Sequence, residues 1–248
     1  MLAHVAEDLG DRLGVINHQF GDVGIIAGEA GPIKAVLAAS GKCTNIQTIA
    51  PPQGEDLGLA AQSFDAVFSI LYLHCVNDVP GYLAQCAGAL RPDGLFMCCF
   101  FAGDTLIELR NAWLEAEAEL GGASPRVAPM VGLREMGGLL QRANLAMPVV
   151  DSDRLTLRYA NVLALLREIK SIGYANPLSE RSKNLSSPRL LEALMQHYAV
   201  DADGRINATL EMFWALAWKP HDSQPKPKQP GSATMRFEDI LKKLDNAN

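Results

Sequence analysis

The segment Val23–Gly31, with the sequence VGIIAGEAG, decides how the rest of this chain is interpreted. Its β-branched residues are typical of a buried strand, and Gly28 and Gly31 allow a tight turn and the close approach of a ligand or a helix. Pro32 suits the first turn of a helix. In an open α/β sheet, a strand, a glycine turn and a helix start form the usual cradle for a nucleotide-like ligand, because free N–H groups point outward there. The full G-x-G-x-x-G spacing is absent, so a connection that needs glycine only for packing is an equal alternative.

The composition is that of a globular protein with an acidic balance. The 248 residues are 48% hydrophobic and 20% charged, and the formal net charge is −6. A chain of this length can bury a sizeable core, and we expect one domain with an elaborated end. General nucleic-acid binding and attachment to anionic membranes both depend on a basic surface. We therefore expect no nucleic-acid partner.

The cysteines and the hydropathy pattern indicate a cytoplasmic protein. The five cysteines form no C-x-x-C pair and lie mostly in apolar segments, which is typical of reduced, buried thiols. The longest apolar run, around 95–102, is far shorter than the about 20 residues that a membrane-spanning helix needs. The N-terminus also lacks the basic stretch followed by an apolar one that marks a secretory signal.

The pattern of apolar runs and turn residues predicts alternating strands and helices. The stretch 64–73, FDAVFSILYL, is the strongest strand signal, because a nearly continuous apolar run is typical of a buried parallel strand. Further strands are predicted over 45–50, 95–101, 147–151, 154–159 and 208–218, the last one antiparallel at the sheet's edge, and helices over 1–20, 33–41, 78–90, 104–120, 133–143, 161–172 and 188–198. Asp78 is an expected N-cap, as is Asp104 or Thr105, and RPDG at 91–94 is an expected turn.

Two segments interrupt the expected sheet. Residues 160–205 are predicted to form a helical insertion or cap before the last strand, within a body that covers 1–219. The stretch PHDSQPKPKQP at 220–230 has the composition of a linker. Apolar residues then recur at helical spacing, which predicts a terminal helix within 220–248: Phe237, Ile240, Leu241 and Leu244.

Several segments carry a family resemblance. They are LHCVNDVP at 73–80, RPDG at 91–94, GDTLIELR at 103–110, SPR at 124–126 and GSAT at 231–234. Together with the order of elements, they resemble the class I S-adenosylmethionine-dependent methyltransferase superfamily. The branch is that of the methyltransferase-like assembly factors of respiratory complex I and their bacterial relatives, near the malonyl-carrier-protein O-methyltransferases of biotin synthesis. The resemblance implies an α/β, Rossmann-like, mostly parallel sheet of seven strands with helices on both faces, and S-adenosylmethionine as cofactor.

The segment 24–31 departs from the pattern of this family. Family members end the first strand with a pattern like L-D-L-G-C-G-x-G, whereas Ile25 here takes the place of the acid, and Ala27 and Glu29 take the places of two glycines. A carboxylate at Glu29 would lie close to the methionine carboxylate of the cofactor, which is repulsive at short range. The acid that usually ends the second strand is also absent, at Ile49 and Ala50.

The resemblance assigns cofactor contacts to particular positions. Backbone contacts are expected from the first turn, a polar contact to the adenine from the loop after the second strand, and a pocket lining from the end of the third. The positions are Ala27, Gly28, Glu29 and Gly31; Gln53 and Asp56; and Ser69 to Leu71. The alternative for Gln53 and Asp56 is that they are ordinary polar residues of a loop.

Three residues are candidates for catalysis. His74 follows an apolar strand at its carboxyl end, where α/β sheets bind ligands, although a structural histidine is the alternative. Asp104 and Glu108 lie four apart, so on a helix both carboxylates would share a face and could contact a cationic substrate. The alternative is that Asp104 caps the helix and Glu108 is solvated. The five histidines are scattered without an H-x-D pair, and we therefore expect no metal site.

Three functions are compatible with these observations. The first is methyl transfer to a small carboxylate or a carrier-bound acid, in which the enzyme mainly positions the nucleophile. The second, implied by the resemblance, is a complex I assembly factor that modifies an arginine of a partner subunit or chaperones that subunit. The third is a non-catalytic protein that has kept the fold and lost the cofactor.

Overall fold

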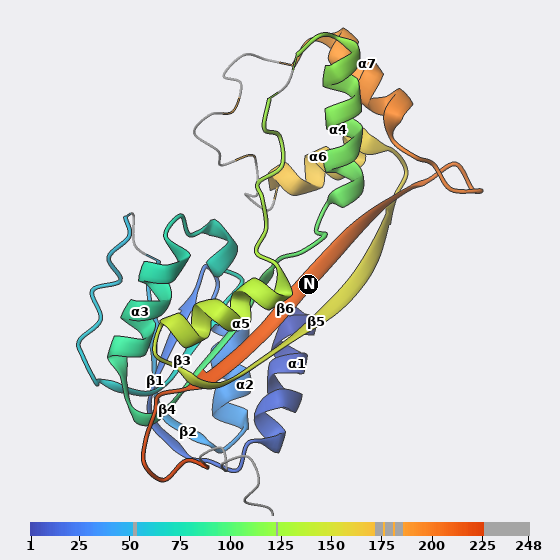
Figure 1. Cartoon of the computed structure of the whole chain (residues 1–248). Coiled ribbons are helices and arrows are strands. Elements are labelled where there is room, and N and C mark those ends of the chain that lie inside the picture. The colour runs from blue at the N-terminus through green and yellow to red at the C-terminus, as the bar shows by residue number, and fades with distance from the viewer. Residues whose placement is uncertain (52–53, 123, 172–175, 177–180, 182–185, 226–248) are drawn as a thin grey trace, which may run out of the picture.

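A computed structural model describes residues 1–51, 54–122, 124–171, 176, 181 and 186–225 (Figure 1). These residues form one sheet of six strands in the order β2-β1-β3-β4-β6-β5. The strands are β1 (Phe20–Ala27), β2 (Cys43–Ile49), β3 (Phe64–Ile70), β4 (Leu90–Phe101), β5 (Ala146–Tyr159) and β6 (Ile206–Trp218). Neighbours from β2 to β4 pair in parallel, and β6 is antiparallel to both β4 and β5. The α/β, mostly parallel class is confirmed, with six strands in the described residues instead of the expected seven.

Helices α1 (Leu2–Val15) and α2 (Gly31–Ala39) cover one face of the sheet. Side chains alternate between the two faces of a strand, so every second residue of the central strands contacts these helices. Ile25, Phe68 and Met97 belong to this layer and are almost completely buried.

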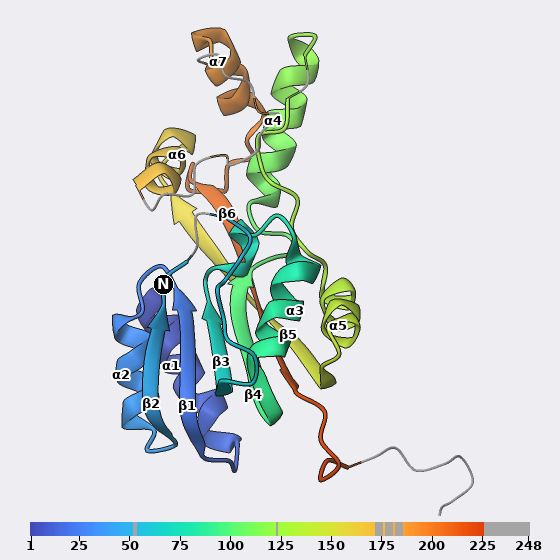
Figure 2. The ribbon, with the colours of Figure 1, turned by 90° about the vertical axis from the view of Figure 1, so that its left-hand side faces the viewer.

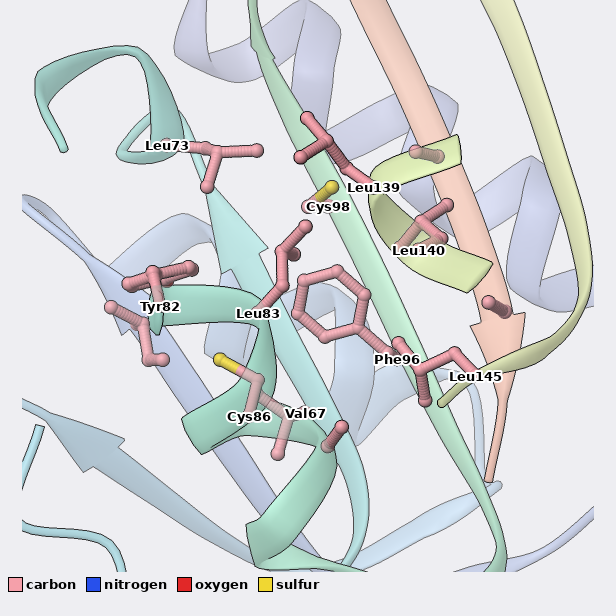
Figure 3. Close-up of a cluster of buried hydrophobic side chains, with 14 of the residues drawn as sticks. Val67, Leu73, Tyr82, Leu83, Cys86, Phe96, Cys98, Leu139, Leu140 and Leu145 are labelled. Atoms are coloured by element: carbon pink, nitrogen blue, oxygen red, sulfur yellow. The ribbon is translucent and has the colours of Figure 1, made fainter. Parts of the chain in front are cut away.

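Helices α3 (Val79–Ala89) and α5 (Leu133–Arg142) cover the opposite face. Figure 3 shows Phe96 and Cys98 of β4 between Leu83 of α3 and Leu140 of α5. Burial raises the pKa of the Cys86 thiol to about 12 and also raises the pKa of Cys98 and Cys99. All five cysteines are free, as expected, although Cys75 is exposed.

A third group of helices lies beyond the carboxyl ends of the parallel strands (Figure 2). These helices are α4 (Ile107–Glu119), α6 (Val162–Ser171) and α7 (Pro188–His197), and they share a separate apolar cluster. β6 pairs with β4 only over Met212–Trp218, whereas its pairing with β5 continues to Ile206. The two long strands therefore extend past the sheet as a ribbon, and we call the three helices that pack beside it the cap.

The expectation for residues 91–94 is wrong. The segment 91–94 is not a turn between elements but a bulge inside β4, because the register changes from Phe64↔Leu90 to Ala66↔Leu95. Arg91 stabilises this bulge, since its guanidinium pairs with Asp22 of β1 at 2.9 Å and with Asp65 of β3 at 2.8 Å.

The end of the sheet also differs from expectation. Strands 147–151 and 154–159 form the single strand β5 without a bend, because β6 pairs along almost its entire length. β6 is antiparallel as predicted but lies inside the sheet, and β5 is the edge strand. The terminal helix and the motif at 231–234 lie outside the described residues.

Candidate functional site

The connection between β1 and α2 lies at the carboxyl edge of the sheet. Ala27 ends β1 and is buried, whereas Gly28 and Glu29 are exposed. No described side chain caps α2, whose N-cap residue is Ala30. A Cβ atom added at Gly28 or at Gly31 would meet nothing within 4 Å. The turn therefore leaves open space beside the uncapped N–H groups of a helix start, which favours an anionic or polar ligand group.

The side chains around this turn fit a nucleoside cofactor less well than its backbone does. Ile25 and Ile26 are fully buried on opposite faces of the sheet and leave no polar group at the end of β1. Ile49, at the end of β2, packs against the apolar core. Glu29 adds an exposed carboxylate where the family has glycine. The cradle thus has the open backbone of a cofactor loop but lacks the acids that would bind ribose hydroxyls.

The other expected cofactor positions that the structure describes make local contacts. Ser69 is fully buried, and its hydroxyl lies 2.6 Å from the Tyr82 hydroxyl, so it is engaged inside the core. Leu71 has a left-handed φ of 52° and donates its N–H to Cys99 O at 2.7 Å. Asp56 is exposed and accepts from the N–H of Gly58 at 2.8 Å. Gln53 lies outside the described residues.

His74 lies in the short 3-10 helix η1 (Leu73–Cys75), directly after β3. Its Nδ1 accepts from the N–H of Phe101 at 3.4 Å, and its ring lies 4.7 Å from the Phe101 ring. Burial lowers the pKa of His74 to about 4. The imidazole is therefore neutral at pH 7, and because Nδ1 accepts, Nε2 carries the proton. Asp78, a few residues later, caps α3 as predicted by accepting from the N–H of Gly81 at 2.9 Å.

Asp104 and Glu108 do not share a helical face. Asp104 lies in the turn before α4, and the N-cap of the helix is Leu106, in the left-handed conformation. The Asp104 carboxylate pairs with the Arg154 guanidinium of β5 at 3.2 Å, and both side chains are more than half exposed. Glu108, in the first turn of α4, accepts from the N–H of Thr209 at 2.9 Å and from its hydroxyl at 2.5 Å. Both acids thus connect α4 and the turn before it to the β5–β6 ribbon.

Two residues near these acids were not expected from the sequence. Glu211 of β6 accepts from the N–H of Asp104 at 2.6 Å, and Arg154 of β5 pairs with the Asp104 side chain. The sequence does contain a pattern that marks Glu211. Asn207, Thr209 and Glu211 place polar groups at every second position of an apolar strand, and therefore on one face.

Among the described residues, no group of three or more His, Cys, Asp or Glu side chains is arranged to hold a metal ion. In the same part of the chain, no helix combines the length and the apolar character needed to cross a membrane.

The fold is similar to solved structures of methyltransferase type. BH2331 from Bacillus halodurans C-125 superimposes with a TM-score of 0.55 at 10% identity, over 86% of this chain and 98% of that one. YcgJ from Bacillus subtilis gives a TM-score of 0.53 at 14% identity, over 88% and 99% of the two chains. A family model described as a methyltransferase domain matches residues 33–98. The fold is therefore of the methyltransferase type, and residues 33–98 match a methyltransferase domain.

Sequence relatives are more specific than the likeness of the fold. The chain is 37% identical to arginine-hydroxylase NDUFAF5, mitochondrial, of Mus musculus over 194 residues, which are 77% of this chain and 57% of the relative. The corresponding protein of Dictyostelium discoideum is 35% identical over 187 residues, or 74% of this chain and 43% of the relative. Malonyl-(acyl-carrier protein) O-methyltransferase of Xylella fastidiosa strain M23 is 35% identical over 175 residues, or 70% and 57%.

These relatives confirm the branch that the sequence motifs indicate. The chain spans about half of the length of the curated relatives it matches. Because the NDUFAF5 relatives are named as mitochondrial proteins, the cytoplasmic location of this chain stays a prediction.

Proposed function

We propose that this chain acts on an arginine side chain of a protein partner. The observation that carries this proposal is the pair between Asp104 and Arg154, an exposed carboxylate already holding a guanidinium at the carboxyl edge of the sheet, next to the cap. The NDUFAF5 relatives, which are named arginine-hydroxylases, support the same substrate group. A subunit of respiratory complex I is the partner that we propose, and a pull-down from respiring cells that recovers no such subunit would count against it.

The energetics of the pair support exchange with a partner. Because both side chains are more than half exposed, the pair contributes only about 0–1 kcal/mol to stability. An incoming arginine can therefore displace Arg154 at low cost and form a forked contact with the Asp104 carboxylate. Lysine lacks this planar fork, so the site should discriminate between the two cations.

Titration calorimetry with two matched peptides tests the proposal. One peptide carries a single arginine, and its twin carries lysine at the same position. We expect the arginine peptide to bind more tightly than its twin. Asp104→Asn should weaken the affinity for the arginine peptide about tenfold, or by about 1.4 kcal/mol. Asp11→Asn, at an exposed position of α1, is the control and should bind like the wild type. Equal binding of both peptides, or an unaffected Asp104→Asn variant, would overturn the proposal.

A second candidate function is methyl transfer to an acid. The open turn at Gly28 and Gly31 and the uncapped start of α2 favour it. S-adenosylmethionine would supply the electrophilic methyl group, and the turn at Gly28 and Gly31 together with the exposed Asp56 would hold it. Calorimetric titration with S-adenosylmethionine distinguishes the candidates: no heat and no thermal shift at millimolar ligand would exclude methyl transfer and favour a non-catalytic protein.

A further inference from the structure

The turn between β4 and α4 determines where Asp104 lies. It covers residues 103–106, directly after the carboxyl end of β4. Regular pairing between β4 and β6 ends at Phe101↔Met212. Beyond that point the turn contacts two residues of β6, Thr209 and Glu211, and the N–H of Gly103 donates to Val131 O at 3.1 Å.

Glu211 contacts this turn with its backbone and with its side chain. Its carbonyl oxygen accepts from the N–H of Ala102 at 3.0 Å, and its Oε2 accepts from the N–H of Asp104 at 2.6 Å. Its own N–H donates to the Thr105 hydroxyl at 3.0 Å. Leu106 N–H, next in the chain, donates to Thr209 O at 2.8 Å. Only the contact to Asp104 depends on the Glu211 side chain.

Gly103 shows how closely the Glu211 side chain approaches. The residue has a left-handed φ of 54°, and a Cβ atom added there would overlap the Glu211 carboxylate. The backbone conformation favours glycine at this position, and a Cβ atom there would have to displace the Glu211 carboxylate. The side chain of Glu211 thus fits against the turn where the chain leaves β4.

We propose that Glu211 is a positioning residue for the arginine site. Its carboxylate holds the backbone N–H of Asp104 and thereby fixes the direction of the Asp104 side chain, which contacts the guanidinium. This inference rests on the proposed function. It assigns a role to a residue that itself does not touch the substrate arginine.

Hydrogen exchange of the Asp104 amide tests the contact directly. We expect Glu211→Ala to speed this exchange at least tenfold. Glu211→Gln keeps an acceptor oxygen and should restore slow exchange. Gly103→Ala keeps the carboxylate but pushes it away, so it should speed the exchange as Glu211→Ala does. Glu192→Ala, an exposed position in the cap, is the control and should leave the exchange unchanged.

Affinity for the arginine peptide tests the positioning role. We expect Glu211→Ala to lose about tenfold in affinity and Glu211→Gln to bind within about twofold of the wild type. An equal loss in both variants would mean that the charge of Glu211 contacts the arginine itself, which overturns the inference. Wild-type affinity in Glu211→Ala overturns it as well.

The two measurements separate the inference from the function on which it rests. A wild-type protein that binds no arginine peptide contradicts the proposed function, whereas unchanged Asp104 exchange in Glu211→Ala contradicts the contact regardless of the peptide.

Discussion

Glu108 and Thr209 form two hydrogen bonds with each other, across 101 residues of sequence. One carboxylate oxygen of Glu108 accepts from the N–H of Thr209 at 2.9 Å and the other from its hydroxyl at 2.5 Å. Because Thr209 is buried in β6, this contact fixes the first turn of α4 against the ribbon. The contact is a structural alternative to the catalytic role that the sequence suggested for Glu108.

We expect Glu108→Ala to destabilise the protein. The change leaves the buried N–H and hydroxyl of Thr209 without their acceptor, and hydrogen bonds to charged groups contribute about 1.5–3 kcal/mol. Chemical denaturation should show a decrease of that size in the free energy of unfolding, with a smaller decrease for Glu108→Gln. A Glu108→Ala variant with wild-type stability would return Glu108 to the catalytic candidates.

The strands of the fold could be predicted because their signals are local. β1, β3 and the apolar part of β4 are short apolar runs between turn residues, which identify buried strands without knowledge of their neighbours. The bulge at 91–94 could not be predicted, since it depends on Arg91 meeting Asp22 and Asp65 on two other strands. The continuity of β5 similarly depends on its pairing with β6.

The candidate site was less predictable, because its contacts also join residues that are far apart in the sequence. An acid such as Asp104 attracts attention because it follows a strand, but its conformation is set by Glu211, 107 residues away. The N-cap of α4 is Leu106, in a left-handed conformation, which differs from ordinary capping preferences. Its N–H donates to Thr209 O. Local sequence patterns mark the polar positions of β6, but they do not show which residues these positions contact.

We expect His74 to make stability depend on pH. Burial lowers the pKa of His74 to about 4 from an ordinary value of 6.5, which the unfolded chain retains. Below pH 6.5 the unfolded state therefore binds a proton that the folded state does not, so the stabilisation present above that pH is lost on acidification. The loss is about 1.4 kcal/mol per pH unit until the folded pKa is reached.

Urea denaturation between pH 7 and pH 4 measures this effect. His74→Gln cannot titrate and should lose less stability on acidification than the wild type. The exposed His221 is the control position, and His221→Gln should follow the wild type because it keeps the half-buried His74. An equal decrease in the free energy of unfolding with falling pH in the wild type and in His74→Gln would contradict this prediction.

Glu117 should stabilise the cap through Arg126. The Glu117 side chain is nearly buried, accepts from Arg126 Nε at 2.8 Å and also accepts from the N–H of Ser124 at 2.6 Å. The same guanidinium lies 4.6 Å above the ring of Trp113. Removing one partner of a buried pair leaves the other charge uncompensated, so we expect Glu117→Ala to cost about 3 kcal/mol.

Chemical denaturation measures the effect at Glu117, and Glu192→Ala in the same cap is the control. Since Glu192 is exposed, its replacement should change stability by less than about 0.5 kcal/mol. Similar changes in the free energy of unfolding for Glu117→Ala and Glu192→Ala would show that the stability of the cap does not depend on the Glu117–Arg126 pair.

Glu29 should weaken any binding of S-adenosylmethionine. It is exposed in the turn between β1 and α2, beside the uncapped helix start at which a carboxylate would bind. Two carboxylates a few ångströms apart in solvent repel each other by about 1 kcal/mol, which corresponds to a factor of about five in affinity. We therefore expect Glu29→Gln to bind S-adenosylmethionine about fivefold more tightly than the wild type in titration calorimetry.

Added salt should reduce the difference, because it screens the repulsion. Glu55→Gln, in the exposed loop after β2, is the matched control and should leave the affinity unchanged. If Glu29→Gln binds no more tightly than the wild type, the Glu29 carboxylate does not face the ligand, and the departure from the glycine pattern has no electrostatic effect on the cofactor.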